Sequence, residues 1–570
     1  MFRPNQTHHQ QDIFGIEAQL SPDLRKRLLE SKEYAFYKEI FCRIPETLFA
    51  ELYAEKPATR PNAPVNLLVG AMILQHQHDW TFEELLDRVA FDLKVRAALG
   101  LWSLDQESFC RATLFNFQRR LRDHMVASGQ DKFQAVFDCL TEDQLERFGL
   151  KGTIQRCDST QIGTNIRDYT RIELLVEVVL RMWRVLGEAH QAEHRERFAP
   201  YVEAKTSGLF LHRLRRSDID ATLQRLGELY AWMVEVLKAD YGATEIHRIV
   251  CRVFAEHFTR VEERIAVRPA EQISSGSLQS PDDPEATYRD RGDESFRGYV
   301  LHLSETADPE NDLQLITDVA VAPNNVEDSR ILGERLPEMH RKTPDLVELH
   351  TDGAYGSEAN DRELAQRQIL AVQTGIRGPG ARAPMRIVQE ADLLHVRCAA
   401  GHVVPGSPTR KHFKAEFAAA HCAGCPFAAV CQTQPRLHGG RTFYFTKEEL
   451  LKRLRHYRIE TLPPERQTLR ANVEATVKEF KAPCRDGKLR TRGLGGVRRY
   501  AFLRAIGINF GRIYRHLRRL SSGREAPVPV PAPAYRLPAA LHGLLTPLRR
   551  LVRALRGCGG DPLPVAIAFA

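Results

Sequence analysis

The chain has 570 residues, of which 43% are hydrophobic and 27% are charged, so it can bury large cores and divide into several domains. No run of 18 apolar residues occurs, and the N-terminus lacks the basic start and apolar block of a secretory signal. We therefore expect a cytoplasmic protein without a membrane contact. The eleven cysteines are odd in number and mostly scattered, which favours reduced thiols over a disulfide framework.

The net charge of +8 is unevenly distributed along the chain. Residues 481–556 contain 18 Lys or Arg residues against two acidic residues, so the rest of the chain is net acidic. A basic block of this size favours a polyanionic partner, most commonly nucleic acid, and a solubilising tail is the alternative. Tyr500, Phe502, Phe510 and Tyr514 alternate with these arginines, which favours a folded surface that faces nucleic acid.

The first part of the chain has a helical pattern. Residues 25–150 place apolar side chains at intervals of three and four, which predicts an all-helical domain over 1–150. Residues 152–162 (GTIQRCDSTQI) predict a strand that ends at Asp158. About a hundred residues of helical pattern and a Ser/Gly/Pro/Asp-rich connector follow, which we interpret as a helical insertion and linker over 164–295.

The next segment has the pattern of a mixed sheet. Two alternating stretches, RGYVLHLSET and LQLITDVAVAP, predict a hairpin. They are followed by a strand that ends at Asp352, by a helix (SEANDRELAQRQ) and by a further strand (ILAVQTGIRG). The predicted fold is therefore mixed α+β, with a sheet built from 151–163 and 296–380 and flanked by helices. Taken alone, Asp352 before Gly353 is an ordinary turn signal.

A third acidic residue lies in a predicted helix downstream. Pro463 and Pro464 suit a helix start and Pro483 a stop. Within this helix Arg470, Glu474 and Lys481 would share one face; a salt-bridged surface stripe is the alternative. Because divalent cations that promote phosphoryl transfer are held by clustered carboxylates, two strand-end aspartates and this glutamate suggest a metal site.

These residues together resemble the DDE transposases of bacterial insertion sequences, whose catalytic core is RNase-H-like. The likeness rests on CDSTQI around Asp158, TDGAYGS around Asp352, DPEATYRDRGDESFRGYVLHLSET before and within the hairpin, PNNVEDS after it, and the spacing of Arg470, Glu474 and Lys481. QHDWTFEELLDRVAFDLKVRAALGL is also similar to the family, so the resemblance spans about residues 35–520. The family pattern has a tyrosine where this chain has Gln467.

The resemblance implies DNA cleavage at the ends of an insertion sequence and strand transfer into target DNA. It implies that Asp158, Asp352 and Glu474 hold two Mg²⁺ or Mn²⁺ ions and that Arg470 and Lys481 contact DNA phosphates. Further DNA contacts are expected from the following basic segment, at Arg490, Arg492, Arg498 and Arg499. The partners would be double-stranded DNA, as terminal inverted repeats and as target, and a second copy of the chain, near the bacterial nucleoid.

Two other functions stay open at this point. A metal-dependent DNA nuclease would use the same three acids without strand transfer. A non-catalytic DNA-binding protein derived from a transposase would keep the basic surface and lose at least one acid, and the presence of all three disfavours it.

A cysteine cluster lies in a predicted insertion over 381–445. Cys398, Cys422, Cys425 and Cys431 include one C-x2-C pair, and four thiolates could bind Zn²⁺ and staple a loop-rich segment. An iron–sulfur cluster, a site in which His402 or His421 replaces a cysteine, and a metal-free set of reduced thiols are the alternatives. Residues 446–520 would complete the catalytic core with the glutamate helix and basic segment, and 521–570 would form a disordered Pro-rich basic tail.

Overall fold

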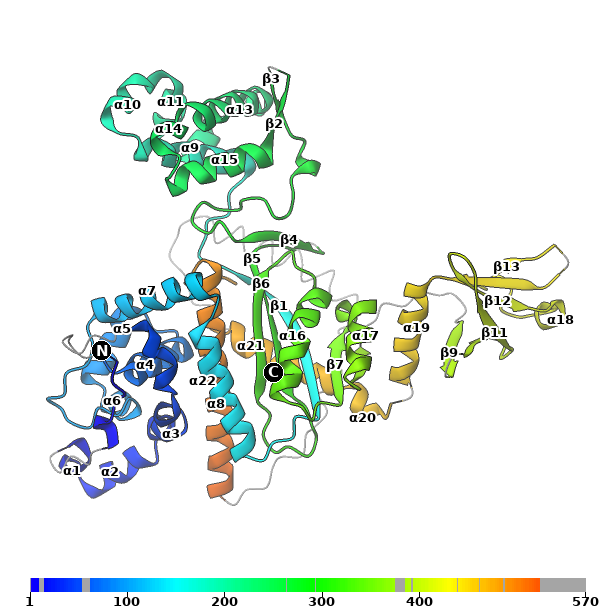
Figure 1. Ribbon diagram of the computed structural model, residues 1–570, viewed down its shortest axis with the longest axis horizontal. Coiled ribbons are helices and arrows are strands. Elements are labelled where there is room, and N and C mark those ends of the chain that lie inside the picture. Colours follow the sequence, from blue (N-terminus) through cyan, green and yellow to red (C-terminus); the bar gives the residue numbers. More distant parts are fainter. Residues whose placement is uncertain are drawn as a thin grey trace, which may run out of the picture. The chain divides into compact units, whose positions relative to one another are not determined.

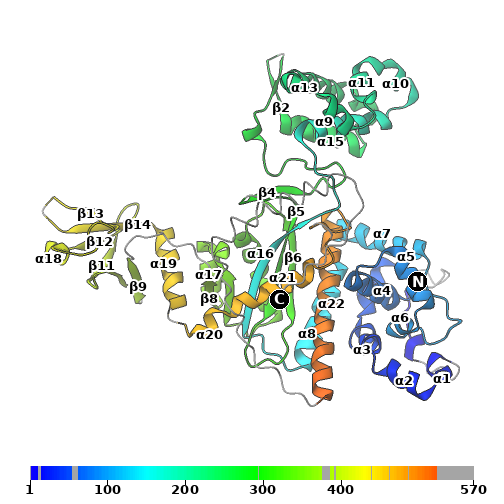
Figure 2. The same ribbon diagram turned by 180° about the vertical axis from the view of Figure 1, so that it is seen from behind.

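The computed structural model describes residues 2–9, 15–53, 62–262, 264–292, 294–374, 385–390, 393–437, 439–460, 462–484 and 487–522. Residues up to Arg518 belong to one unit of the chain, and Figures 1 and 2 label its helices and strands. The predicted Pro-rich tail at 521–570 lies almost entirely outside the described residues. Within them, no helix combines the length and the apolar character that crossing a membrane requires.

The N-terminal part is helical, as the apolar spacing predicts. Helix α4 is buried from Val65 to Gln75, consistent with its nearly continuous apolar sequence. Helix α5 starts at a capping box, in which the Thr81 hydroxyl accepts from the Glu84 N–H and the Glu84 carboxylate accepts from the Thr81 N–H. The helices are α1 (Ile16–Gln19), α2 (Pro22–Leu29), α3 (Lys32–Glu39), α4 (Val65–His78), α5 (Phe82–Phe91), α6 (Leu93–Ala98), α7 (Arg111–Ser128) and α8 (Lys132–Arg147).

A mixed sheet forms the centre of the fold. Its strands are β1 (Ile154–Gly163), β4 (Thr287–Arg291), β5 (Glu294–Thr306), β6 (Ile316–Pro323), β7 (Glu348–Asp352) and β8 (Leu370–Thr374). The order β6-β5-β1-β7-β8 has β5 antiparallel to its two neighbours and β1, β7 and β8 mutually parallel. Counted along the chain, these five strands lie in the order 3-2-1-4-5, which is the arrangement of an RNase-H-like core.

Three features of this sheet differ from the sequence prediction. Strand β1 does not end at Asp158 but continues to Gly163, because Thr160 to Gly163 keep pairing with β5. Strand β4 lies inside the segment predicted as a connector and pairs with the start of β5. Helix α16 (Asp328–Lys342), which follows β6, was not predicted because Pro337 interrupts its helical pattern.

The glutamate segment is not one continuous helix. It divides into α20 (Pro464–Gln467), a 3₁₀ turn over Leu469–Asn472 and α21 (Val473–Lys481). Arg470 therefore lies in the 3₁₀ turn and Glu474 in the first turn of α21, which contacts β1. Helix α17 (Glu358–Gln366) follows β7, and α19 (Lys447–Glu460) contacts β8.

A helical segment with its own core is inserted between β1 and β4. Its buried residues, such as Leu175, Tyr230 and Val250, form a separate hydrophobic cluster. The elements are α9 (Arg171–Val185), α10 (Glu188–Glu193), α11 (Arg195–Val202), α12 (Ser207–Arg213), α13 (Ile219–Val236), α14 (Lys238–Tyr241), α15 (Glu245–His257) and the hairpin β2 (Phe258–Val261) and β3 (Arg264–Val267).

The cysteine-rich segment is an antiparallel sheet rather than a loop-rich insertion. Phe417, Phe443 and Phe445 are buried in its own small core, so a metal staple is not needed to explain its folding. The expectation of a loop-rich segment was wrong because these alternating strands were overlooked. The elements are β9 (Arg386–Glu390), β10 (Leu393–Arg397), β11 (Val403–Pro408), β12 (Phe413–Phe417), α18 (Ala419–Cys422), β13 (Gln434–Pro435) and β14 (Arg441–Phe445).

The basic C-terminal segment forms one long helix, α22 (Leu494–Ser521). Tyr500, Phe502 and Phe510 are buried and pack in the same cluster as residues of the N-terminal helices and the central sheet. The expectation that these aromatic side chains face nucleic acid was therefore wrong. Their spacing among the arginines reflects the buried stripe of an amphipathic helix.

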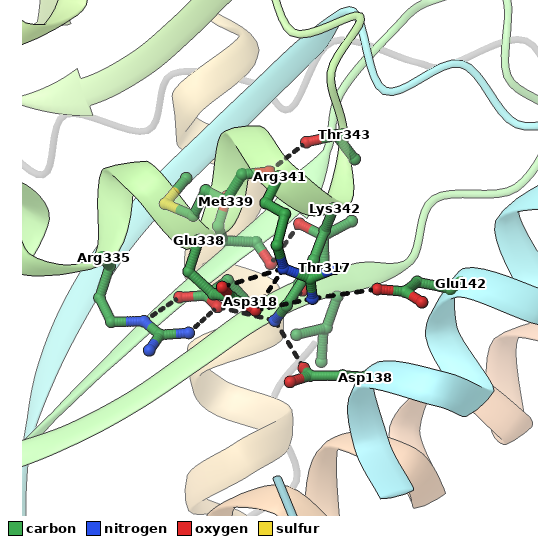
Figure 3. A network of polar contacts seen from close by, with 12 residues as sticks. Asp138, Glu142, Thr317, Asp318, Arg335, Glu338, Met339, Arg341, Lys342 and Thr343 are labelled. Atoms are coloured by element: carbon green, nitrogen blue, oxygen red, sulfur yellow. Dashed lines mark hydrogen bonds and ion pairs between the residues drawn. The ribbon is translucent and has the colours of Figure 1, made fainter. Parts of the chain in front are cut away.

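A buried ion-pair network joins α8, β6 and α16 (Figure 3). Asp318 on β6 accepts from Arg335 and Lys342 of α16, and Lys342 also pairs with Asp138 of α8. Burial alone would raise the pKa of Asp318, but the two neighbouring cations outweigh it and hold this pKa below its ordinary value. The saturated pairing indicates a structural carboxylate rather than a metal ligand.

Candidate active site

Asp158 and Asp352 lie on adjacent parallel strands at the same level of the sheet. Arg156 of β1 is opposite His350 of β7, and each aspartate is two residues further along its strand. Because side chains in a strand alternate between faces with a period of two, this register puts both carboxylates on one face. The sequence predicts that Asp158 and Asp352 lie close together. The pairing of β1 with β7 brings them together, although Asp158 lies in the middle of its strand and not at its end.

The two carboxylates are differently buried and both are hydrogen-bonded locally. The Asp158 side chain is 14% exposed, and its Oδ1 accepts from the Ser159 N–H at 2.9 Å. The Asp352 side chain is 30% exposed, and its Oδ1 accepts from the Ala354 N–H at the start of the turn Gly353–Tyr355. In both residues the second oxygen, Oδ2, is left to face a cation.

That cation is Arg470. Its Nη2 lies 3.2 Å from Asp158 Oδ2 and 3.7 Å from Asp352 Oδ2, so one nitrogen contacts both carboxylates. The pKa of Asp158 is raised by burial, and the Arg470 guanidinium and the Ser159 N–H oppose this rise, whereas Asp352 adds to it. The two aspartates therefore sense each other's charge, as residues of one site must.

Glu474 is not brought to this pair. It is exposed in the first turn of α21, and among the described residues no three His, Cys, Asp or Glu side chains are arranged to hold a metal ion. Two of the three expected carboxylates thus fit a divalent-cation site as hard oxygen donors, and the third does not. The metal-ligand role of Glu474 remains a prediction.

A buried glutamate that the sequence reasoning missed anchors the helix that carries Glu474. Glu305 on β5 is fully buried, and it accepts from Arg156 at 2.6 Å, from Thr476 of α21 at 2.7 Å and from Arg512 of α22 at 2.7 Å. Burial opposes its ionisation, but the two arginines hold its pKa below the ordinary value. The sequence YVLHLSET contains a hint of this role, because Glu305 is an acidic residue on a strand face that is otherwise apolar.

Lys481 lies at the other end of α21 over the same strand. Its Nζ donates to Thr160 Oγ1 at 3.2 Å, and Thr160 is two residues beyond Asp158, on the same face of β1. Arg470 and Lys481 therefore stand on opposite sides of Asp158 along the strand. The predicted cations Arg470 and Lys481 therefore both lie against β1, Arg470 at Asp158 and Lys481 at Thr160.

Of the four predicted arginines of the basic segment, two form ion pairs with aspartates and three line a cavity, and Arg492 does both. Arg490 pairs with Asp79 at 3.1 Å and Arg492 with Asp282 at 2.8 Å. Arg492, Arg498 and Arg499 line a cavity of about 710 Å³ between the start of α22 and helix α7. Helix α7 contributes Arg119 and Arg122 to the same cavity, which sequence reasoning did not single out.

The four predicted cysteine ligands line one cavity of about 310 Å³ in the β9–β14 segment. Burial raises the pKa of Cys422, and the neighbouring Cys431, Cys425 and Cys398 add to the rise, so the thiols are close enough to interact. In the described part of the chain, however, they do not form a preformed metal-binding group. The geometry brings the thiols together without supporting zinc.

Two family models match the chain. Residues 397–514 match a model described as "Transposase DDE domain", and residues 25–120 match "Transposase domain (DUF772)". The first match includes Arg470, Glu474 and Lys481 but neither Asp158 nor Asp352. The link between the two aspartates and the matched segment is therefore made by the geometry described above.

Other comparisons add little. No curated protein matches the chain significantly. A solved structure described as the cryo-EM structure of piggyBac transposase synaptic complex with hairpin DNA is 8% identical, covers 87% of this chain and 76% of its own, and has a TM-score of 0.30. That score is too low to support an argument about fold.

Proposed function

We propose that this chain, a DDE transposase by its two matched segments, cuts DNA at the ends of a mobile element and joins the freed 3′ ends to target DNA. The observation that carries the proposal is the approach of Asp158 and Asp352 to one nitrogen of Arg470. Arg470 is 312 and 118 positions away from these two aspartates in the sequence, so it is the fold that brings the three side chains together.

The DDE domain implies use of a divalent metal ion, and we propose Mg²⁺ or Mn²⁺ at Asp158 and Asp352, with Glu474 as third ligand. When bound, such an ion activates the attacking oxygen and stabilises the departing one. The chain itself would position the DNA strand, through Arg470, which contacts both aspartates, and through Lys481, which contacts Thr160 two residues beyond Asp158. Glu474 lies apart from the two aspartates, so we propose for it only the role of a third ligand.

For DNA binding we propose the arginine-lined cavity between α7 and α22. Its arginines come from α7, from α22 and from the segment just before α22, and two acids, Asp131 and Glu285, line it with them. Arginines on a concave surface bind phosphate oxygens of the DNA backbone and release counterions. Since two element ends must be processed together, we also propose that two copies of the chain act on DNA.

The test is a cleavage and strand-transfer assay with the full chain, Mg²⁺ or Mn²⁺, and duplexes that carry the terminal inverted repeats flanking the coding region. The wild type should produce nicked ends with free 3′-hydroxyl groups and joined products. Asp158→Ala, Asp352→Ala and Glu474→Ala should each lose both products while still binding the duplex. Glu310→Gln, which changes an exposed acid paired with Lys151, is the matched control.

The outcomes separate the competing functions. Cleavage without joined products would favour a nuclease over a transposase. Full activity of any one of the three alanine variants removes that residue from the proposed site, and binding without cleavage by the wild type in either metal contradicts the proposed chemistry.

Zinc at Cys398, Cys422, Cys425 and Cys431 remains a prediction with limited support. The shared cavity favours it, and the absence of a preformed metal group among the described residues weighs against it. The metal content of protein purified without chelators decides the matter. One zinc per chain that is lost in Cys425→Ser would support the site, and an iron–sulfur cluster would show visible absorbance.

A further inference from the structure

Arg470 makes an unexpected contact. The sequence pattern assigns this residue to DNA phosphates, yet its Nη2 contacts both of the aspartates that the proposed function assigns to a metal ion. The guanidinium and a divalent cation cannot occupy the same space between these carboxylates. The contact therefore bears on when the site can accept a metal.

We propose that Arg470 is an internal counter-ion that closes the carboxylate pair in the DNA-free protein, and that its transfer to a DNA phosphate opens the site to the metal. This inference rests on the proposed function for the identity of the metal ligands. It adds a regulatory step, in which metal binding and DNA binding are coupled through one side chain.

The need for a counter-ion follows from burial. Asp158 and Asp352 contact the same Arg470 nitrogen and their side chains are 14% and 30% exposed, so one positive charge between them offsets the repulsion of two partly buried negative charges. A substitute cation in the chain would also keep the site from binding ions when no substrate is present. Arg470 is the cation that the described residues place there.

The contact of Arg470 with the aspartates nevertheless leaves its guanidinium able to move to a DNA phosphate. Only Nη2 reaches the carboxylates, the Nη2 to Asp352 distance of 3.7 Å is an ion pair rather than a hydrogen bond, and the buried Nε has no hydrogen-bond partner. Arginine binds carboxylates and phosphates best through two parallel N–H donors, so a phosphate that approached this guanidinium would satisfy donors that the aspartates leave unpaired.

The backbone around Arg470 also suits a movable element. It lies in the short 3₁₀ turn Leu469–Asn472, between α20 and α21, and short 3₁₀ segments between helices are common at hinges. Besides the ion pair of Arg470 with Asp158, a hydrogen bond from Arg156 Nη1 to the Leu469 carbonyl oxygen at 3.2 Å holds the turn to β1. Helix α21, in contrast, is fixed to the sheet by buried Val473, Thr476 and Phe480.

The direct test is Mn²⁺ binding to the DNA-free full chain, followed by electron paramagnetic resonance of the free ion. We expect Arg470→Gln and Arg470→Ala to bind Mn²⁺ about tenfold or more tightly than wild type, because the positive charge that competes with the ion for the two carboxylates is removed. Arg330→Ala, which removes an exposed cation on α16, should leave the affinity unchanged. Combining Arg470→Gln with Asp352→Ala should abolish the gain and so locate it.

Equal or weaker Mn²⁺ binding in both Arg470 variants, with circular dichroism showing that they are folded, overturns the proposal. A second measurement tests the coupling to DNA. A saturating duplex should tighten Mn²⁺ binding by the wild type and have little effect in Arg470→Gln, because linkage requires the shared residue; equal tightening in both also overturns it.

The two proposals can fail separately. Tight Mn²⁺ binding by the Arg470 variants without any DNA cleavage by the wild type would reject the transposase chemistry and keep the counter-ion role. Cleavage by the wild type with unchanged Mn²⁺ affinity in the variants would do the reverse.

Discussion

The buried carboxylate of Asp318 offers a sharp stability test (Figure 3). Its side chain is 1% exposed and neutralises Arg335 and Lys342, whose side chains are 18% and 3% exposed. Asp318→Asn keeps the shape and removes the negative charge, which leaves Asp138, paired with Lys342, and the more distant Glu338 as the acids that act on these two cations. Breaking a buried ion pair costs about 3–5 kcal/mol, and because Asp138 still pairs with Lys342 we expect about 3 kcal/mol.

The assay is urea unfolding at pH 7, with the matched variant Glu334→Gln as control. Glu334 pairs with Arg330 on the exposed side of the same helix, so its loss should cost about 0.5 kcal/mol or less. A lower urea midpoint at unchanged slope identifies a loss of stability. If Asp318→Asn costs no more than the control, the network is not a structural anchor, and Asp318 has to be reconsidered as a functional acid.

The same carboxylate predicts a pH dependence. Its pKa in the folded protein lies below the ordinary aspartate value of about 3.9, so its contribution is complete above that pH and is lost as the pH falls toward the folded pKa. The stability difference between wild type and Asp318→Asn should therefore be constant between neutral pH and about pH 5 and shrink in stronger acid. A difference that instead grows on acidification would contradict the assigned sign.

Three further predictions concern the sheet, its contact with α22 and the DNA surface. Gly298→Ala should destabilise the fold by about 1–3 kcal/mol in the same urea assay, because φ is +142° and a methyl group would lie 2.3 Å from a carbonyl oxygen of β1. Asn509→Ala should cost about 2 kcal/mol or more by that measure, because the buried Asn509 side chain satisfies both the N–H and the C=O of Ile316. Arg119→Ala and Arg498→Ala should each reduce the slope of log K against log salt for duplex binding by about 1 if they contact phosphates, and an unchanged slope measured by fluorescence anisotropy removes the residue from the DNA surface.

Alternating and helical periodicity predicted most of the core sheet. The hairpin, the strand that ends at Asp352 and the helices of the N-terminal part are present as β5 and β6, β7, and α4 to α8. Their apolar residues recur at the spacing of a helix or a strand, or form continuous apolar runs as in α4, so their pattern is visible locally. The position of Asp158 within β1 was missed because Thr160 and Gln161, although polar in type, are buried in pairing with β5.

What the sequence could not reveal is the pairing of charges across elements. Arg512, Thr476 and Arg156 converge on Glu305 from two helices and a strand, and Arg335 and Lys342 reach Asp318 from a helix that Pro337 obscured. Such contacts depend on packing between segments far apart in the chain. The identity of an acidic residue in the sequence therefore does not tell whether its carboxylate binds a metal ion or neutralises a buried arginine.

The placement of Arg470 and Glu474 shows why the helix boundary matters for the mechanism. In one continuous helix they would be four residues apart on a common face. Here α21 begins at Val473, so Arg470 reaches the aspartates from the 3₁₀ turn while Glu474 stays exposed on the helix. The turn Leu469–Asn472, which carries Arg470, leads directly into the first turn of α21, which carries Glu474. On the proposed mechanism, release of the arginine and recruitment of the glutamate therefore involve the same short stretch of backbone.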